Sequence, residues 1–358
     1  MMVVKHAARI AVPLDPVARF LGQEAARMGL DLQSTGAGHV LQLDDARLSL
    51  QRAPEGCELL IEAGTEALLH ELREAIIHIA TEHHQPPLHL QWDPRPAAAN
   101  SVNPGNPAKL TVAKVVQNQR ISPSFRRLRL AGDFARFRDG GMHFRLIFGP
   151  EGAGLPHADE NGTTHWPEGI DRWHRPPYTV RAIDPDCAWI DVDIFLHDGG
   201  RVTDWAKATR PGDLVALTGP GGKTPQVADW IAYIGDETAL PIIARGLELL
   251  PEGTQGVARI VLADPADRQP IRHPEGVDLQ WLSGDQFSAL SALQTLDLPP
   301  QGRYVFFAAE RQQSGAARDW LVAQGLQRGE FTTANYWTEG WVPPADQARP
   351  RAGWITAV

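Results

Sequence analysis

The chain has 358 residues, 43% of them hydrophobic and 22% charged, which is the composition of a globular protein. This length exceeds what one hydrophobic core usually organises and predicts two or three domains. The net charge of −9 argues against a nucleic-acid or anionic-membrane surface as the main role. No stretch approaches transmembrane length, and charges and prolines interrupt residues 1–20, so we expect neither a membrane span nor a signal peptide. Cys57 and Cys187 make no metal-ligand spacing, which favours a reduced, cytoplasmic protein.

The N-terminal part is predicted to be a small α+β domain over residues 1–94. Residues 15–29 predict a helix that places Val17, Phe20, Leu21, Ala25 and Met28 on one face. Short strands are expected within 38–53 and 56–64, a second amphipathic helix over 65–84, and a last strand near 88–92. A Pro-, Asn-, Gly- and Ala-rich linker follows at 95–108.

After the linker the hydrophobic period changes to two, and residues 109–225 predict an antiparallel β-barrel. Candidate strands are 110–117, 125–132, 142–149, 178–184, 189–197 and 212–222. The alternation is clearest in 189–197, where apolar and other residues are expected on opposite faces. The first set is Ile190, Val192, Ile194 and Leu196, and the second is Asp191, Asp193 and Phe195.

Residues 226–358 predict an α/β domain with a parallel sheet and helices on its faces. A strand at 230–236 leads through a tight turn into a helix with Leu240, Ile243, Leu247 and Leu250 inward. Further buried strands are expected at 257–264, 277–284 and 303–310, with a helix over 315–326.

Two strand–helix turns are candidate anion sites. Parallel sheets bind ligands beyond the carboxyl ends of their strands, which here carry Gly235–Pro241, Ala263–Asp264 and Ala308–Glu310. Asp236 or Thr238 is a candidate cap for the helix after the first of these strands. In the barrel, His197–Ala208 runs through a Gly pair into a predicted helix whose N–H groups, with Thr203 as N-cap, suit a diphosphate. Ordinary capped turns would have the same sequences.

The segment "HRPPYTVR", His174–Arg181, adds two guanidinium groups beside an aromatic ring. Either these charged side chains are simply exposed to solvent, or the segment is a binding site for a planar anion. From about Leu110 to Trp337 the chain resembles the siderophore-interacting proteins, or ViuB-like ferric-siderophore reductases. The matching pieces include "GMHFRLIFG", "YTVR", "IDVDIFLHDGG", "GDETALP" and "YWTEG". Residues 1 to about 94 are similar to a small uncharacterised domain found in some bacterial proteins.

The resemblance implies a ferredoxin-reductase-like protein with an FAD-binding barrel and a pyridine-nucleotide-type α/β domain. Tyr178 would contact the flavin ring, Thr179 and the Val180 main chain its edge, and Arg175 and Arg181 flavin or diphosphate oxygens. His197, Thr203 and Trp205 would surround the diphosphate and adenine side. The α/β domain would bring NAD(P)H or reduced ferredoxin to the flavin. Its implied cofactor-binding residues are Gly235, Asp236, Glu237, Thr238 and Glu310.

The implied reaction passes single electrons to the Fe(III) of a siderophore or another ferric chelate, and Fe(II) is held less tightly by hard oxygen ligands. No catalytic acid, nucleophile or protein metal ligand is required. Ferric catecholates are anionic, so a basic pocket is expected. Its candidate members are His143, Arg145, Lys223 and Arg245.

Two positions depart from the family pattern. Pro176 stands where the superfamily has an arginine two residues before the tyrosine, and Thr338 stands where relatives often carry a basic residue. His78, His83, His84 and His89 lack the spacing and companions of a metal site and are interpreted as solvated. Two alternatives stay open: an NAD(P)H:flavin or diaphorase-type reductase, and a non-catalytic ferric-siderophore-binding protein.

Overall fold

The structure is a computed structural model that describes residues 3–27, 30–43, 45–80, 84, 88–93, 110–138, 141–158, 164–221, 226–327 and 329–340. Met28, His83, Lys223 and the linker 95–108 therefore lie outside the described residues, as does the His78 side chain. The chain divides into two compact units, which are described separately. The first comprises residues 1–108 with 156–166, and the second comprises 109–155 with 167–358.

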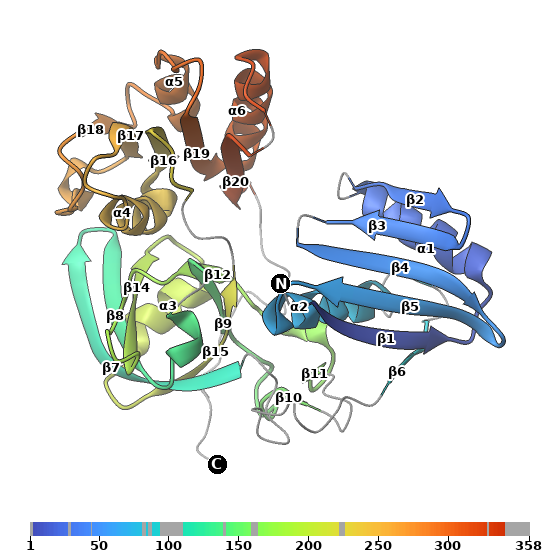
Figure 1. Ribbon diagram of the computed structural model, residues 1–358. Helices are drawn as coiled ribbons and strands as arrows, with labels where there is room; N and C mark the ends of the chain where they lie inside the picture. The colour runs from blue at the N-terminus through green and yellow to red at the C-terminus, as the bar shows by residue number, and fades with distance from the viewer. Residues whose placement is uncertain are drawn as a thin grey trace. The chain divides into compact units, whose positions relative to one another are not determined.

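The first unit contains a six-stranded sheet in the order β2-β3-β4-β5-β1-β6 (Figure 1), and its neighbouring strands run antiparallel. Buried residues of α1 and α2 share one core with the inward residues of β5, as the predicted α+β domain requires. The first strand was not predicted. The elements are β1 (Val4–Ile10), α1 (Leu14–Arg27), β2 (Leu32–Thr35), β3 (Gly38–Gln42), β4 (Ala46–Ala53), β5 (Gly56–Ala63), α2 (Glu66–His78) and β6 (Leu90–Trp92). A small hairpin, β10 (His157–Ala158) with β11 (Thr164–His165), completes the unit.

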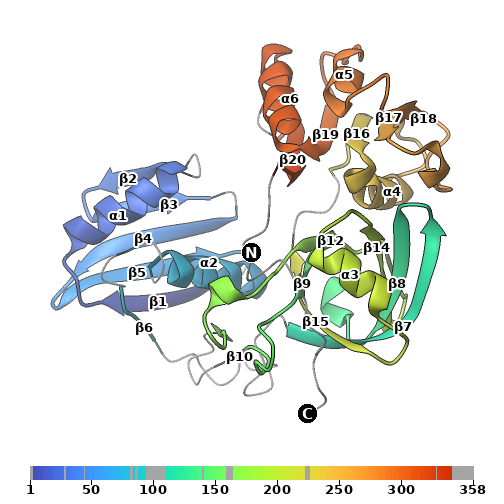
Figure 2. The same ribbon diagram turned by 180° about the vertical axis from the view of Figure 1, so that it is seen from behind.

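The second unit begins with the predicted antiparallel barrel, whose strand order is β12-β9-β15-β7-β8-β14-β13. Helix α3 packs against it (Figure 2), because Val202, Trp205 and Ala206 join the barrel core. The strands are β7 (Leu110–Ser122), β8 (Phe125–Ala131), β9 (His143–Ile147), β12 (Pro177–Thr179), β13 (Ala182–Ile183), β14 (Trp189–Phe195) and β15 (Leu214–Gly221). The helical segments are η3 (Ala135–Phe137), η4 (Ile170–Arg172) and α3 (Arg201–Ala208).

The strand predicted over 178–184 is interrupted at Val180 and Arg181. The Val180 N–H donates to the Met142 carbonyl at 3.0 Å, whereas the Arg181 N–H donates to the Asp191 carbonyl at 2.8 Å. These two residues therefore form the seam at which the chain leaves β9, the partner of β12, and joins β14, the partner of β13. One continuous strand over 178–184 could not pair with both β9 and β14.

The α/β part contains the predicted parallel sheet, with five strands in the order β18-β17-β16-β19-β20. Its edge strand β20 was not predicted. Helix α4 covers one face of this sheet, and α5 and α6 cover the other (Figure 1). The prediction that residues 277–284 form a buried strand was wrong, because β18 is a half-exposed edge strand. The strands are β16 (Trp230–Asp236), β17 (Gln255–Leu262), β18 (Val277–Ser283), β19 (Arg303–Glu310) and β20 (Phe331–Trp337). The helical segments are η5 (Glu237–Ala239), α4 (Leu240–Glu248), η6 (Pro265–Asp267), α5 (Ala289–Gln294) and α6 (Arg311–Ala323).

The barrel and the α/β part share a hydrophobic core. Phe125 and Met142 of the barrel cluster with buried residues of the parallel sheet and of α4. Beside this cluster, the buried carboxylate of Asp267 accepts hydrogen bonds from the Ser122 hydroxyl at 2.6 Å and the Ser124 N–H at 2.8 Å. The two parts are thus joined by both apolar and polar contacts.

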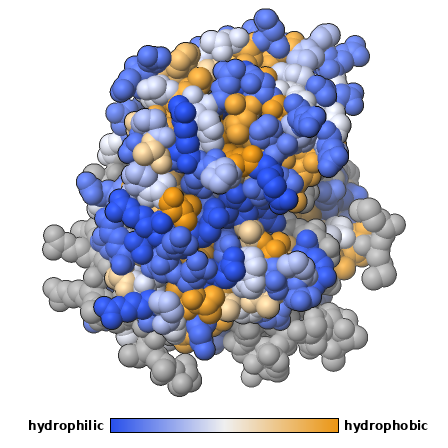
Figure 3. Space-filling model, turned by 90° about the vertical axis from the view of Figure 1, so that its left-hand side faces the viewer, coloured by the Kyte–Doolittle hydropathy of each residue, from blue (hydrophilic) through white to orange (hydrophobic). Residues whose placement is uncertain are grey.

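The face of the molecule seen in Figure 3 is mostly hydrophilic, with apolar residues in small separated groups. Single exposed apolar side chains are normal on a protein surface and need no partner to explain them. Among the described residues, no helix has the length and apolar character needed to cross a membrane.

Candidate functional site

The seam segment, residues 174–181, lies between β9 and α4. In the β12–β9 pair, Tyr178 is opposite Phe144, and Thr179 is opposite His143. The half-buried Tyr178 packs against the barrel core, and burial raises the pKa of its phenol, which therefore stays protonated. Thr179 and Val180 are buried. Tyr178 is thus the seam residue best placed to offer a ring face to a planar ligand.

The main-chain groups of Val180 already have partners. Its N–H donates to Met142, and its carbonyl accepts a hydrogen bond from the Arg245 guanidinium of α4. A flavin contact through the Val180 main chain would have to share or replace these bonds. Arg175 is half-buried, and its carbonyl accepts a bond from Nη1 of Arg145 at 2.8 Å.

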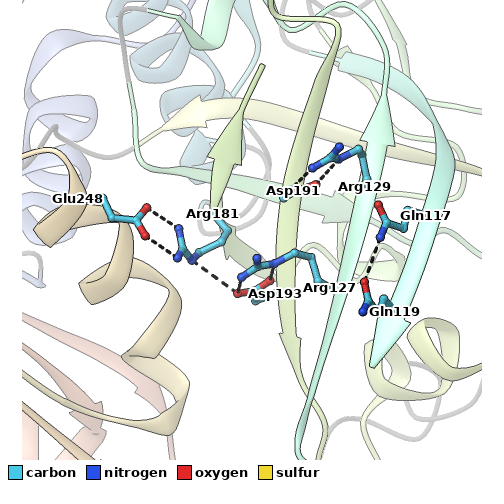
Figure 4. A network of polar contacts seen from close by, with 8 residues as sticks. All are labelled: Gln117, Gln119, Arg127, Arg129, Arg181, Asp191, Asp193 and Glu248. Atoms are coloured by element: carbon cyan, nitrogen blue, oxygen red, sulfur yellow. Dashed lines mark hydrogen bonds and ion pairs between the residues drawn. The ribbon is translucent and has the colours of Figure 1, made fainter. Parts of the chain in front are cut away.

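The structure gives Arg181 a partner other than the predicted phosphate oxygens. Its Nη1 and Nη2 donate to the two carboxylate oxygens of Glu248 on α4, at 2.7 and 2.8 Å. Its Nε lies 3.7 Å from Oδ2 of Asp193 on β14. The residue is 7% exposed. Arg181 therefore connects the barrel to the α/β part (Figure 4).

The polar face predicted for β14 is buried, contrary to a simple in–out alternation. Asp193 accepts two bonds from Arg127 at 2.6 and 2.7 Å, and Asp191 accepts two from Arg129 at 2.8 Å each. Both arginines come from β8, the neighbouring strand (Figure 4). The bond to Asp193 raises the pKa of Arg127. Charge pairing across two strands allows these carboxylates to be buried.

The start of α3 presents uncapped N–H groups. The N-cap is Gly200, and no side chain caps this end of the helix. The prediction that Thr203 is the N-cap was therefore wrong: Thr203 lies inside the first turn, and its hydroxyl accepts the His197 N–H at 3.2 Å. The exposed His197 ring lies over Gly200, where a Cβ would come within 2.6 Å of it. Free N–H groups at such a helix start favour an anion.

Two residues that the sequence did not single out as ligands border the same helix start. Arg201, the first residue of α3, donates to the Gly149 carbonyl at 2.8 Å, yet its buried Nε has no partner among the described residues. The buried Nδ1 of His174 is also without a partner within the described part of the chain. Burial and the charge of Arg201 lower the pKa of His174 to about 4. A bound anion would satisfy the unpaired N–H of Arg201, and also that of His174 when the neutral ring carries its proton on Nδ1.

Trp205 of α3 is 1% exposed and stacks edge-to-face with Phe148 in the barrel core. Its side chain has a packing role in this structure, so a contact with a diphosphate would have to come from its main chain. His84, Asp204 and the other titratable residues within the described ranges form no group of three that suits a metal ion.

A cationic cluster gathers where the barrel meets the α/β part, and we define it as His143, Arg145 and Arg245. Nε2 of His143 lies 3.1 Å from the Tyr336 hydroxyl of β20. Burial, then Arg245, then Arg145 lower the pKa of His143, so both arginines lie within electrostatic reach of the His143 ring. The pKa of Arg245 is lowered to about 10 by burial and by Arg181. Three of the four predicted substrate residues thus converge.

The carboxyl edge of the parallel sheet is lined by acidic caps. Asp236 accepts the Thr238 N–H at 3.0 Å and its hydroxyl at 2.5 Å, so Asp236 caps the short turn η5. Helix α4 itself begins after Ala239, and neither Asp236 nor Thr238 is its N-cap. The other oxygen of Asp236 accepts Nε1 of the 42% exposed Trp337 at 2.8 Å. Glu310 caps α6 through the Gln312 and Gln313 N–H groups at 2.5 and 3.2 Å, which lowers its pKa.

Gly235 and Glu237 complete this edge. A Cβ on Gly235 would lie 2.6 Å from both Ala239 Cβ and the Ala308 carbonyl, so this glycine permits close strand–helix packing. Burial, followed by the charge of Asp236, raises the pKa of Glu237. Asp236 and Glu310 already cap η5 and α6 at this edge, where the indole of Trp337 is an exposed apolar surface.

Comparison with known families matches most of the second unit. A family described as the siderophore-interacting FAD-binding domain matches residues 114–224, and one described as siderophore-interacting protein matches residues 228–340. The ferric vibriobactin reductase ViuB of Vibrio cholerae is 30% identical over 243 residues, which span 63% of this chain and 88% of the relative. The NADPH-dependent ferric-chelate reductase of Escherichia coli is 30% identical over 242 residues, 64% and 92% of the two chains.

The fold comparison agrees. A crystal structure of a siderophore utilization protein from T. fusca aligns with a TM-score of 0.58 and 28% identity, covering 68% of this chain and 98% of that one.

Proposed function

Because the chain belongs to the siderophore-interacting protein family, we propose that it is an FAD-dependent ferric-siderophore reductase that releases iron as Fe(II). NAD(P)H is the proposed electron donor, with reduced ferredoxin as the alternative. NADPH is the first donor to test, since the Escherichia coli relative is named for it. Each NADPH would reduce two ferric ions: NADPH and two Fe(III) give NADP⁺, a proton and two Fe(II).

The residues of the barrel fit FAD. The uncapped start of α3 and the Nε of Arg201, which has no partner among the described residues, would supply donors for a diphosphate. Nδ1 of His174 would add one in the tautomer that carries the proton there. Tyr178 would hold the ring system by stacking, with Thr179 at its edge. When bound, FAD would accept two electrons as a hydride and pass them on one at a time. The protein itself has to bind, orient and shield these groups.

The cationic cluster is the observation that carries the proposal. A chain with a net charge of −9 brings His143, Arg145 and Arg245 together beside the seam segment. The positive charge of Arg145 and Arg245 would attract an anionic ferric chelate to this place. Because its pKa is lowered, His143 is neutral at pH 7 and can exchange a hydrogen bond with Tyr336 for one with a chelate oxygen. Arg145 is exposed and can meet the substrate first.

We further infer a cytoplasmic location, where NAD(P)H and ferredoxin are available. Cys57 and Cys187 are both free and buried, as is common in a reducing compartment.

The decisive experiment is an anaerobic assay of the FAD-loaded full chain. The protein is mixed with NADPH, NADH or reduced ferredoxin and with the iron(III) complex of 2,3-dihydroxybenzoate, and Fe(II) is trapped with a colorimetric chelator. The proposal expects Fe(II) to form with at least one donor. Rapid reduction of free flavin without any Fe(II) would identify a flavin reductase instead. A protein that binds the ferric complex but no FAD would be a carrier.

A further inference from the structure

The seam segment is tied to helix α4 at two consecutive residues. The Val180 carbonyl accepts a hydrogen bond from Arg245, and the Arg181 guanidinium donates two to Glu248. Arg245 and Glu248 are three residues apart, so they lie on one face of α4. The polarity of the two links is opposite: α4 donates in one and accepts in the other. We call this arrangement the α4 clamp.

The α4 clamp has little freedom to move. A bidentate arginine–carboxylate pair fixes both distance and orientation, because two parallel N–H···O bonds must be satisfied together. The Nε side of Arg181 faces Asp193, which is itself held by Arg127 (Figure 4). Arg181 is therefore oriented by β14 on the barrel side before it reaches Glu248. The chain of contacts runs from β8 through β14 and the seam segment to α4.

This arrangement leaves Arg181 no free fork for a phosphate. Both Nη atoms are used by Glu248, and the residue is 7% exposed. A diphosphate would have to displace a carboxylate that already has the best geometry for guanidinium. The buried Nε of Arg181 also makes no hydrogen bond within the described structure, but it faces the Asp193 carboxylate at 3.7 Å. The buried Nε of Arg201 likewise has no hydrogen-bond partner there, and Arg201 lies at an uncapped helix start, where an anion is favoured.

We propose that Arg181 and Glu248 are positioning residues that set α4 against the seam segment, and do not bind the cofactor's phosphates. Helix α4 follows directly on β16 and the Asp236 turn, so fixing α4 also fixes the carboxyl edge of the sheet. This inference rests on the proposed function insofar as the donor is brought to the flavin from that edge. Transfer between two bound groups is sensitive to such placement, because a displacement of about 1 Å can cost about 100-fold in rate.

The first test is independent of activity. Amide hydrogen exchange of the full chain is compared for wild type, Glu248→Gln and Arg181→Lys, with Asp278→Asn as the control. The Asp278 side chain is 55% exposed and pairs with Arg259 in the same α/β part, and its change is also carboxylate to amide. We expect about tenfold faster exchange at residues 180–183 and 244–249 in both clamp variants. Unchanged exchange there would overturn the inference.

The second test separates positioning from cofactor binding. We expect both variants to keep the dissociation constant of FAD within about threefold, while NADPH bleaches the bound flavin at least tenfold more slowly. Bleaching by dithionite, which needs no docking, should stay at the wild-type rate. The double variant should be no slower than either single one, since both remove the same interaction.

Two results would refute positioning. A tenfold or greater loss of FAD affinity in Arg181→Lys would mean that Arg181 binds the cofactor. Wild-type bleaching by NADPH in both variants would reduce the pair to a structural role. If the proposed function itself is wrong, none of the electron donors will bleach the flavin of the wild-type protein. The hydrogen-exchange experiment would still decide whether the α4 clamp exists.

Discussion

The two buried carboxylates of β14 should respond differently to the same substitution. Asp193→Asn removes the partner of Arg127 and the neighbour of Arg181, and the Asp193 side chain is 1% exposed. Asp191→Asn removes only the partner of Arg129. The guanidinium of Arg129 also lies 3.5 Å from the centre of the Trp189 ring, a contact that survives the substitution.

The expected magnitudes follow from these surroundings. Removing one partner of a buried ion pair costs about 3–5 kcal/mol, and Asp193→Asn should lie near the lower end, because Arg127 is about one third exposed and Arg181 keeps Glu248. Asp191→Asn should cost about 1–2 kcal/mol, because Arg129 can be rehydrated and remains stacked. For a unit of this size, about 1 kcal/mol corresponds to about 2–4 °C in Tm.

Differential scanning calorimetry of the FAD-free full chain measures the difference. The transition of the second unit should fall by about 6–12 °C for Asp193→Asn and by about 2–8 °C for Asp191→Asn, with the smaller loss for Asp191→Asn. Asp278→Asn, which changes a side chain that is 55% exposed, should lower Tm less than either β14 variant. Equal losses for the two β14 variants, or a larger loss for Asp191→Asn, would refute the reasoning that Arg181 makes Asp193 the more constrained site.

Four further predictions concern the site. Tyr178→Ala should weaken FAD retention by about tenfold while far-ultraviolet circular dichroism stays native, because a ring contact is removed; unchanged affinity would exclude the stacking role. Arg201→Met should raise the dissociation constant of FAD by about 10–100-fold, the loss of a charge-assisted hydrogen bond, as measured by fluorescence titration. Arg145→Gln should raise KM for the ferric complex at low salt, and the effect should shrink as salt rises; a salt-independent effect would contradict an electrostatic role. The pKa of His174 is lowered from 6.5 to about 4, so the unfolded chain binds more protons in that window and stability falls as pH decreases through it. His174→Gln should therefore lose Tm less steeply than wild type between pH 6.5 and 4, and parallel curves would argue against the shift.

Local patterns predicted most of the fold. The period-two stretches of the barrel and the strand–helix alternation of the α/β part correspond to observed elements, since each element buries its own apolar face. Strand β1 was missed because His6, Ala8 and Ile10 form its buried face while Lys5 and Arg9 alternate with them, which gives little hydrophobic contrast. The edge position of β18 depends on the order of strands, which one segment does not encode.

The site was less predictable, because its partners are distant in sequence. Glu248 is 67 residues from Arg181, and no local rule connects them. The burial of Asp191 and Asp193 follows from arginines on β8, so an alternating pattern alone predicted a polar outer face. Arg201 had a usable signal: it directly follows the Gly pair that opens α3, where an anion-binding helix start was already expected.

The shared core of the barrel and the α/β part limits how the second unit can be divided. The first family match ends at residue 224 and the second begins at residue 228, so this junction is an obvious boundary for making separate fragments. A fragment ending there would expose Phe125 and Met142, which are 0% and 2% exposed in the intact chain. It would also leave Ser122 and Ser124 without the carboxylate of Asp267. Barrel fragments should therefore aggregate when expressed alone, and exchange of this segment between relatives requires both sides of the junction to be carried together.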